Sequence, residues 1–280
     1  MDINVFLAVI IAALIHALWN GMVKNHKDKH TAVAAIVLGH VPASIVIILI
    51  APLPAIDCIP YIIASAIIHQ GYQWFLLSAY NLGDYTIVYP TARGTGPVIV
   101  TIVSIFFLGV TLTAFELIGI LLISFGILSL SFTGKKSLKD KKALLFAIWT
   151  GFFIGGYSLI DGAGARISGS PLSFMGFSFI LNALMFPTLL SFFNKPNITK
   201  KVFKDALGLF WIGGTASYIV YGIVVWAFTK APIPLVSALR EVSVILALII
   251  GSILLKEKLT LYKVTSILII FSGIVFLKFF

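Results

Sequence analysis

Residues 89–97 read Tyr-Pro-Thr-Ala-Arg-Gly-Thr-Gly-Pro and lie inside a long run of apolar residues. Each proline removes an intrahelical hydrogen bond and kinks a helix, and each glycine weakens a helix but lets another backbone approach. An arginine inside a membrane-length apolar segment normally faces a protein interior or a water-filled cavity. A helix that faced only lipid would gain nothing from these residues. The stretch therefore predicts a broken helix at the polar centre of a membrane protein.

A second polar stretch, Ser-Ala-Leu-Arg-Glu at residues 237–241, echoes the first near the other end of the chain. Arg93 and Arg240 are 147 residues apart. The same offset aligns Leu112 with Leu259, Thr113 with Thr260, and Gly126 with Gly273. The sequence therefore predicts a duplicated protein in which each half brings an arginine to the centre.

The composition places the chain among integral membrane proteins. Of its 280 residues 60% are hydrophobic and only 11% are charged, and the mean hydropathy is +1.08. A soluble domain of this composition would expose too much apolar surface. The net charge of +10 does not indicate nucleic acid, because the charges cluster in short runs between apolar segments. The single cysteine, Cys58, excludes a disulfide within the chain. No His or Cys spacing typical of a metal site is present, so neither a metal nor a cofactor is expected.

A bilayer core is spanned by about 20 apolar residues in a helix. By this measure the sequence predicts an all-α integral membrane protein with ten transmembrane helices. The expected helices are Ile3–Val23, Thr31–Ala51, Pro60–Tyr80, Tyr85–Leu108, Thr113–Thr133, Ala143–Asp161, Pro171–Phe193, Asp205–Phe228, Pro232–Leu255 and Thr260–Phe280. A basic loop at residues 134–142 divides them into two five-helix repeats, residues 1–133 and 143–280. Five helices per half make the halves inverted repeats, a common plan of secondary transporters.

The lysines and arginines predict the orientation of the chain. Fifteen of the 20 lie in the loops after the first, fifth, seventh and ninth expected helices. Only Arg166, Lys230 and Lys278 lie on the opposite side. Basic loops stay in the cytoplasm, so this bias predicts that both termini lie outside. The expected location is the bacterial inner membrane, with several passes.

Five stretches together resemble the drug/metabolite transporter superfamily, and specifically its EamA-type branch of ten helices. They are HALWN at residues 16–20, YPTARGTGP at 89–97, DGAGAR at 161–166, SALRE at 237–241 and KEKLT at 256–260. The resemblance covers the whole chain and implies a two-repeat fold that opens alternately to each side. It also implies export of amino acids or other small metabolites, and one similar subgroup is associated with phosphonate utilisation. The superfamily is usually drawn with both termini in the cytoplasm, whereas the lysine bias of this chain places them outside.

Three charged residues are the main candidates for a binding site. Arg93 and Arg240 lie at similar depths in their segments, and inverted symmetry should bring them together near the midplane. Two guanidinium groups could clamp a carboxylate, phosphonate or phosphate. Alternatively, they satisfy backbone carbonyls freed by nearby prolines, or pair with an acid. Glu241 does not face its neighbour Arg240 along a helix, so we expect it to pair across helices with Arg93. Glu241 is also the candidate for proton coupling, with a permanent ion pair as the alternative.

Aromatic and polar side chains at helical spacing are candidates for the walls of the site and for the binding of a cation. The alternative is that they join helices or form an aromatic belt. The set consists of His16, Trp19, Asn20, His69, Tyr72, Trp74, Tyr89, Tyr157, Tyr218 and Tyr221. Outside the site, Asp84 is expected to cap a helix and Glu116 to complete a capping box with Thr113. Asp161 is expected to pair with Arg166.

These features predict a secondary active transporter that moves a small polar metabolite, such as an amino acid, an organic acid or an aminophosphonate, across the inner membrane, with export favoured. The chain has no phosphate-binding GxxxxGK[ST] loop, so ATP is not expected to drive it. A flippase for a lipid-linked sugar is the alternative within transport; a channel and an intramembrane enzyme are alternatives of other classes. The expected partners are the substrate, the lipid bilayer and a coupling proton, but no nucleic acid. The protein is expected to be a monomer or a homodimer.

Overall fold

A computed structural model describes residues 1–133, 141–195, 197–254 and 260–279. Within these ranges all regular secondary structure is helical, and there is no strand. In chain order the elements are α1 (Ile3–Asn25), α2 (Lys29–Ile50), η1 (Ile56–Cys58), α3 (Ile59–Leu82), α4 (Tyr85–Phe106), α5 (Ala114–Leu130), η2 (Ser131–Thr133), α6 (Lys141–Ile167), α7 (Pro171–Ser191), α8 (Ile198–Asp205), η3 (Leu209–Gly213), α9 (Gly214–Phe228), α10 (Ile233–Leu239), α11 (Val242–Leu254) and α12 (Leu261–Phe279). The all-α class predicted from the sequence is therefore confirmed.

Seven helical stretches of the described chain are long and apolar enough to cross a membrane. They are α1, α2, α6, α7, η3 with α9, α10 with α11, and α12. The apolar helix α5 is shorter, with 17 residues, while α3 and α4 have 24 and 22 residues but carry more polar side chains. Many large apolar side chains are exposed, among them Leu49 and Phe106 at 77% and 78%. An apolar outer surface of this kind fits contact with lipid.

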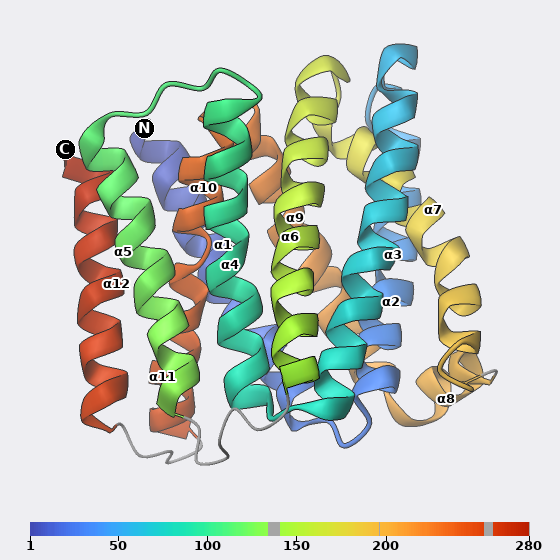
Figure 1. Cartoon of the computed structure of the whole chain (residues 1–280). Helices are drawn as coiled ribbons and strands as arrows, with labels where there is room; N and C mark the ends of the chain where they lie inside the picture. The colour runs from blue at the N-terminus through green and yellow to red at the C-terminus, as the bar shows by residue number, and fades with distance from the viewer. Residues whose placement is uncertain (134–140, 196, 255–259, 280) are drawn as a thin grey trace.

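The helices stand side by side in one bundle, with both chain termini at the same end (Figure 1). The opposite end is the lower one in Figure 1, where α1 ends, α6 begins and α8 lies. Most basic residues of the described chain gather at this lower end: Lys24, Lys27, Lys29, Lys141, Lys142, Lys200, Lys201 and Lys204. The charge asymmetry predicted from the sequence is thus an asymmetry between the two ends of the bundle. The basic loop at 134–140 lies outside the described residues.

The predicted interruption of the helix around Arg93 is wrong, because α4 runs from Tyr85 to Phe106 through both Pro90 and Pro97. A proline in a membrane helix costs one internal hydrogen bond, which neighbouring helices and local adjustment can compensate. The helix breaks instead at the second arginine. Backbone bonds from Glu241, Ser243 and Val244 reach back only three residues, so the chain tightens between α10 and α11.

Several boundaries also differ from the prediction. Helix α6 continues beyond Asp161 to Ile167, and the segment expected to begin at Asp205 starts with a π-helical turn, η3, after the separate short helix α8. The predicted caps are confirmed. Asp84 accepts a hydrogen bond from the Thr86 amide at 2.9 Å, and Thr113 and Glu116 form the reciprocal capping box.

Candidate functional site

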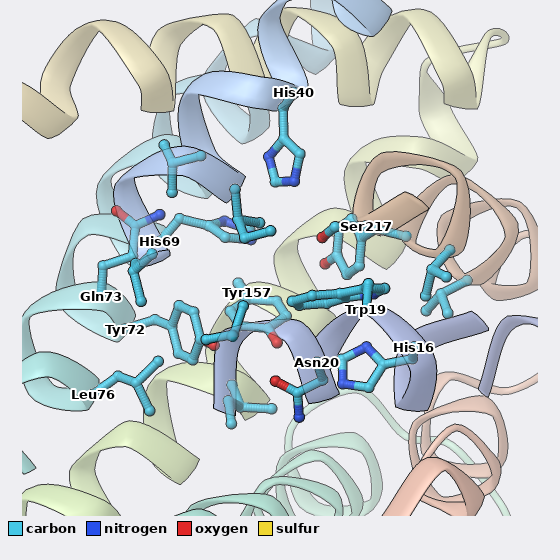
Figure 2. A pocket seen from close by; sticks show the side chains of 18 of the residues that line it. His16, Trp19, Asn20, His40, His69, Tyr72, Gln73, Leu76, Tyr157 and Ser217 are labelled. Atoms are coloured by element: carbon cyan, nitrogen blue, oxygen red, sulfur yellow. The ribbon is translucent and has the colours of Figure 1, made fainter. Parts of the chain in front are cut away.

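A cavity of about 160 Å³ lies in the middle of the bundle (Figure 2). Its walls come from α1, α2, α3, α4, α6, α7 and α9, together with Arg240 at the end of α10. Ten of the site residues proposed from the sequence line it: His16, Trp19, Asn20, His69, Tyr72, Tyr89, Arg93, Tyr157, Tyr221 and Arg240. Segments far apart in the chain thus bring the expected side chains to one place.

Three of the proposed residues do not line the cavity. Trp74 packs against Phe192 and Phe193, with ring centroids 5.4 and 5.0 Å apart. Tyr218 lies in a hydrophobic cluster, where its ring packs against that of Phe179 with the ring centroids 5.9 Å apart. Glu241 is completely buried behind the arginines. The sequence places these three near the other site residues but does not show which side chains other helices cover.

The buried charges form one cluster that joins α4 to the break between α10 and α11. Arg93 Nε lies 2.8 Å from Glu241 Oε2, and Arg240 Nε lies 3.5 Å from Glu241 Oε1. The side chain of Glu241 has no exposed surface, and those of Arg93 and Arg240 are exposed by 10% and 7%. The pair between Glu241 and Arg93 across helices, expected from the sequence, is therefore present. Arg240 also contacts the same carboxylate, because the chain turns sharply at this point.

The arginines have further partners at the cavity wall. Arg240 Nη2 donates to the Tyr157 hydroxyl at 2.9 Å, and Arg93 Nη2 donates to Ser243 Oγ at 3.4 Å. The Arg240 guanidinium lies 5.6 Å from the centre of the Tyr157 ring, within the range of a cation–π contact. Two guanidinium groups therefore share one carboxylate. Among the described residues, this cluster of two arginines and one glutamate has a net charge of +1.

Beside the arginines, the wall of the cavity is aromatic. His69 stacks on Tyr157 with ring centroids 4.3 Å apart and an interplanar angle of 19°, and Tyr221 stacks on Phe179 at 5.5 Å. The Nδ1 atom of His69 lies 2.9 Å from the Ser65 carbonyl oxygen, so this nitrogen carries a proton and donates. Flat rings fixed by one another in this way give the cavity rigid sides.

Several cavity residues were missed in the sequence, chiefly His40, Gln73, Asn182 and Ser217. Gln73 lies four residues after His69 on the same helix, so helical spacing could have found it. His40 and Asn182 are isolated polar residues in apolar helices, and only the packing of α2 and α7 shows that both face inward. Figure 2 shows the His40 ring pointing into the cavity.

Polar atoms in the cavity wall remain without a hydrogen-bond partner among the described residues. They are both ring nitrogens of His40, Trp19 Nε1, Gln73 Oε1 and the Tyr89 hydroxyl. A buried polar atom without a partner is costly, and in native proteins it is normally satisfied by water or a ligand. These atoms are therefore available to a polar molecule in the cavity.

Asp161 and Arg166 do not form the local ion pair expected from the sequence. Arg166 donates instead to the backbone carbonyls of Phe228 and Ala231, at 2.9 and 3.0 Å, and fastens the end of α6 to the turn after α9. Asp161 points to the interior, where it accepts a hydrogen bond from the hydroxyl of Tyr221. The correction follows from the extra length of α6, which places the two residues on different faces of one continuous helix. In the described ranges, no three His, Cys, Asp or Glu side chains are grouped so that they could hold a metal ion.

The second half of the chain matches a known protein family. Residues 141–279 match the profile of the EamA-like transporter family. One solved structure, described only as the crystal structure of a protein, superposes with a TM-score of 0.76 over 99% of this chain and 98% of its own, at 16% sequence identity. At that identity the likeness concerns the fold alone. No functionally curated protein matches the sequence.

Proposed function

We propose that this chain, which belongs to the EamA-like transporter family, is a secondary active transporter of a small polar metabolite that carries an anionic group. The observation behind the anionic group is the cluster of Arg93, Arg240 and Glu241. Both guanidinium groups border the cavity, and among the described residues one carboxylate, that of Glu241, contacts them. A carboxylate, phosphonate or phosphate on the substrate would balance the remaining charge and accept hydrogen bonds from a planar guanidinium.

The size of the cavity favours a metabolite over a lipid-linked sugar. A cavity of about 150 Å³ takes one benzene-sized molecule, and this one has about 160 Å³. A lipid-linked sugar is several times larger and needs an opening toward the bilayer. Aromatic walls beside the arginines suit a compact molecule with an apolar or cationic part, such as an amino acid or an aminophosphonate.

Inverted repeats give a mechanism for alternating access, with residues 1–133 and 143–280 as the two halves. Helix packing is consistent with such a pairing. In this pairing α1 corresponds to α6, α3 to α9 and α4 to α11. Equivalent contacts then occur in both halves: α3 and α4 pack against α6, and α9 and α11 pack against α1. The contacts of α2 with α7 and of α5 with α12 would lie on the axis between the halves. Each half could then rock against the other around the arginines, exposing the cavity to one side at a time.

The basic end of the bundle is proposed to face the cytoplasm of a bacterial cell, with both termini outside the inner membrane. Export follows from the resemblance to exporters of small metabolites and not from the geometry. In this orientation the substrate would reach the arginines from the lysine-rich end and leave at the end that carries the termini.

A ligand screen tests the proposal without an assumed substrate. The purified protein is heated with amino acids, organic acids and aminophosphonates, each paired with the amide or ester that removes the charge of its acidic group, and with polyamines. A ligand that binds only the native state raises the melting temperature by mass action. We expect stabilisation by at least one acid and by none of the amides or esters that lack the anionic group. Hits are then tested for saturable, competable uptake into proteoliposomes. Stabilisation by polyamines alone would contradict an anionic substrate, and uptake without saturation would indicate a channel.

A further inference from the structure

Asp161 is a buried carboxyl group that the proposed binding of an anion does not use. It is 1% exposed, in the middle of the bundle on α6. The Tyr221 hydroxyl donates to its Oδ2, and its Oδ1 is buried without a hydrogen-bond partner among the described residues. No basic nitrogen in the described ranges lies within ion-pair distance of Asp161. The other buried carboxyl, Glu241, contacts two guanidinium groups.

This difference separates the two carboxyl groups chemically. A carboxylate in a membrane protein interior is normally compensated by a cation in contact, and without one it takes up a proton. Glu241 has its compensation from Arg93 and Arg240. Among the described residues no cation is in contact with Asp161, and the groups beside it are the neutral hydroxyls of Tyr221 and Ser65, with His69 and Arg240 farther away. In the conformation described here, Asp161 is therefore the buried carboxyl that is able to hold a proton.

The helices that pack against this part of α6 differ in the ionisable groups that they bring near Asp161. Helix α7 contributes none, since Pro171–Ser191 contains no ionisable side chain. Helix α4 carries Arg93, which is engaged with Glu241, and also Tyr85 and Tyr89, which stack on each other. At the far end of α6, η1 contributes Asp57 and the buried Cys58. The groups facing the carboxyl itself are His69 on α3, Tyr221 on α9 and Arg240 after α10, and Tyr157 follows from α6 itself.

The surroundings of Asp161 are coupled to the cavity. Tyr221 and His69 both line the cavity, and Arg240 contacts Tyr157, whose ring lies 5.9 Å from that of Tyr221. A substrate that attracted Arg240, or a movement of α9 that admitted water, would change what faces the carboxyl. On proton release, the O–H bond at Asp161 would break, its electron pair would stay on the carboxyl oxygen, and the proton would pass to water in the cavity.

We propose that Asp161 binds and releases the proton that is exchanged during transport, while Glu241 remains ion-paired. The inference rests on the proposed transport function, but protonation of a side chain can be measured with no substrate. A negative transport assay and a negative protonation measurement are therefore distinguishable. The first would overturn the proposed function, and the second would overturn the role of Asp161.

Infrared difference spectra of the purified protein in lipid nanodiscs, recorded during a pH titration, test the assignment. A protonated carboxyl shielded from water absorbs at a higher frequency than the hydrated carboxyls of the surface. We expect such a band in the wild type, its complete loss in Asp161→Asn, and no change in Glu116→Gln, which alters an exposed carboxyl of the capping box. Persistence of the band in Asp161→Asn would assign it to another group and overturn the proposal.

A second variant keeps the test decisive if Asp161→Asn does not fold. Tyr221→Phe keeps the carboxyl and removes the hydroxyl that touches it. If the band belongs to Asp161, its frequency and its titration midpoint should both change in Tyr221→Phe. A band identical to that of the wild type would show that the protonated group does not contact Tyr221, and the proposal would fail.

Discussion

At the scale of single residues, the charge cluster combines structural and binding roles in the same atoms. Glu241 joins α4 to the break between α10 and α11 through Arg93 and Arg240. A buried ion pair adds little stability compared with apolar residues of the same volume, but breaking it strands a charge. The cluster therefore has to remain intact for the helices to stay together, while its remaining positive charge is available to a substrate.

Neutralising Glu241 should expose this structural role. Glu241→Gln leaves two buried guanidinium groups without a carboxylate, so we expect a loss of about 3–5 kcal/mol in the free energy of unfolding. The double variant Arg93→Gln/Glu241→Gln removes one charge of each sign and should recover part of that loss. Thermal unfolding of the detergent-purified proteins measures both effects. A double variant less stable than Glu241→Gln would show that Arg93 and Glu241 do not stabilise each other.

At the scale of helices, the sequence predicted the elements well and their joints less well. A helix was found at each expected segment, because apolar runs of membrane length have few alternatives. Pro90 and Pro97 predict an interruption of the helix, yet α4 is continuous. The reason is that one lost hydrogen bond does not end a helix that is packed on several sides. Neither a proline nor a glycine lies within residues 237–244, so the sequence does not indicate the break at Arg240. It depends on contacts with α4, which a single chain segment does not contain.

Contacts between distant segments also decide which residues of the site can be predicted from the sequence. Arginine in an apolar segment is rare enough to be recognised in the sequence, and both arginines were found. His40, Asn182 and the inward direction of Asp161 depend on the rotation of α2, α7 and α6 against their neighbours. Rotation is set by packing of small residues such as Gly39 and Gly214, so these positions required the structure.

The crossing of α2 and α9 at Gly39 gives a prediction. A β-carbon at Gly39 would lie 2.1 Å from the backbone oxygen of Phe210, so Gly39→Ala forces the helices apart. We expect a loss of about 1–3 kcal/mol, typical of overpacking, and a lower melting temperature. Gly21→Ala is the matched control, because a β-carbon at Gly21 meets nothing within 4 Å. An equal effect of the two substitutions would contradict close packing at Gly39.

The short helix α8 is attached to the loop between α1 and α2 by the ion pair of Lys201 with Asp28. Burial alone would raise the pKa of Asp28, but hydrogen bonds from Lys201 and Thr31 outweigh it and hold this pKa below its usual range. The hydrogen bond to Asp28 raises the pKa of Lys201. Stability from Asp28 is therefore present above its unfolded pKa, about 3.9, and lost on acidification, while stability from Lys201 is lost only at strongly alkaline pH.

A spin label at the exposed Thr199 measures this attachment. At neutral pH, Lys201→Met should increase the mobility of the label, and Lys200→Met, on the same helix but not paired with Asp28, should not. As the pH falls below about 4, the pKa of an unpaired Asp, the ion pair should weaken progressively. The wild type should reach the behaviour of Lys201→Met only when the pH falls through the lower pKa of the paired Asp28. If Lys201→Met and the wild type behave alike at neutral pH, the ion pair does not hold α8.

At the scale of the whole molecule, the two ends of the bundle differ in charge, and this predicts the orientation in the membrane. Cys58 is fully buried and would not report on it. In a Cys58→Ala background, a cysteine at Leu53, which is 73% exposed near the end that carries the termini, should react with a membrane-impermeant thiol reagent on intact cells. A cysteine at the exposed Lys27, at the basic end, should react only after lysis. The reverse pattern would place both termini in the cytoplasm.

The central claim is that the guanidinium groups at the cavity recognise an anionic group of the substrate. Arg93→Lys keeps the charge but loses the planar fork, and Arg93→Ala loses both. Neither variant alters Arg240, the other cation that contacts Glu241.

The measurement is the Kd of an acid found in the ligand screen, and of the amide that lacks its anionic group, for the wild type and both variants. We predict that Arg93→Ala weakens binding of the acid by about 1.5–3 kcal/mol, or roughly 10- to 150-fold, with a smaller loss in Arg93→Lys and no change for the amide. Equal losses for the acid and the amide would contradict the claim and would leave Arg93 as a residue that only joins helices.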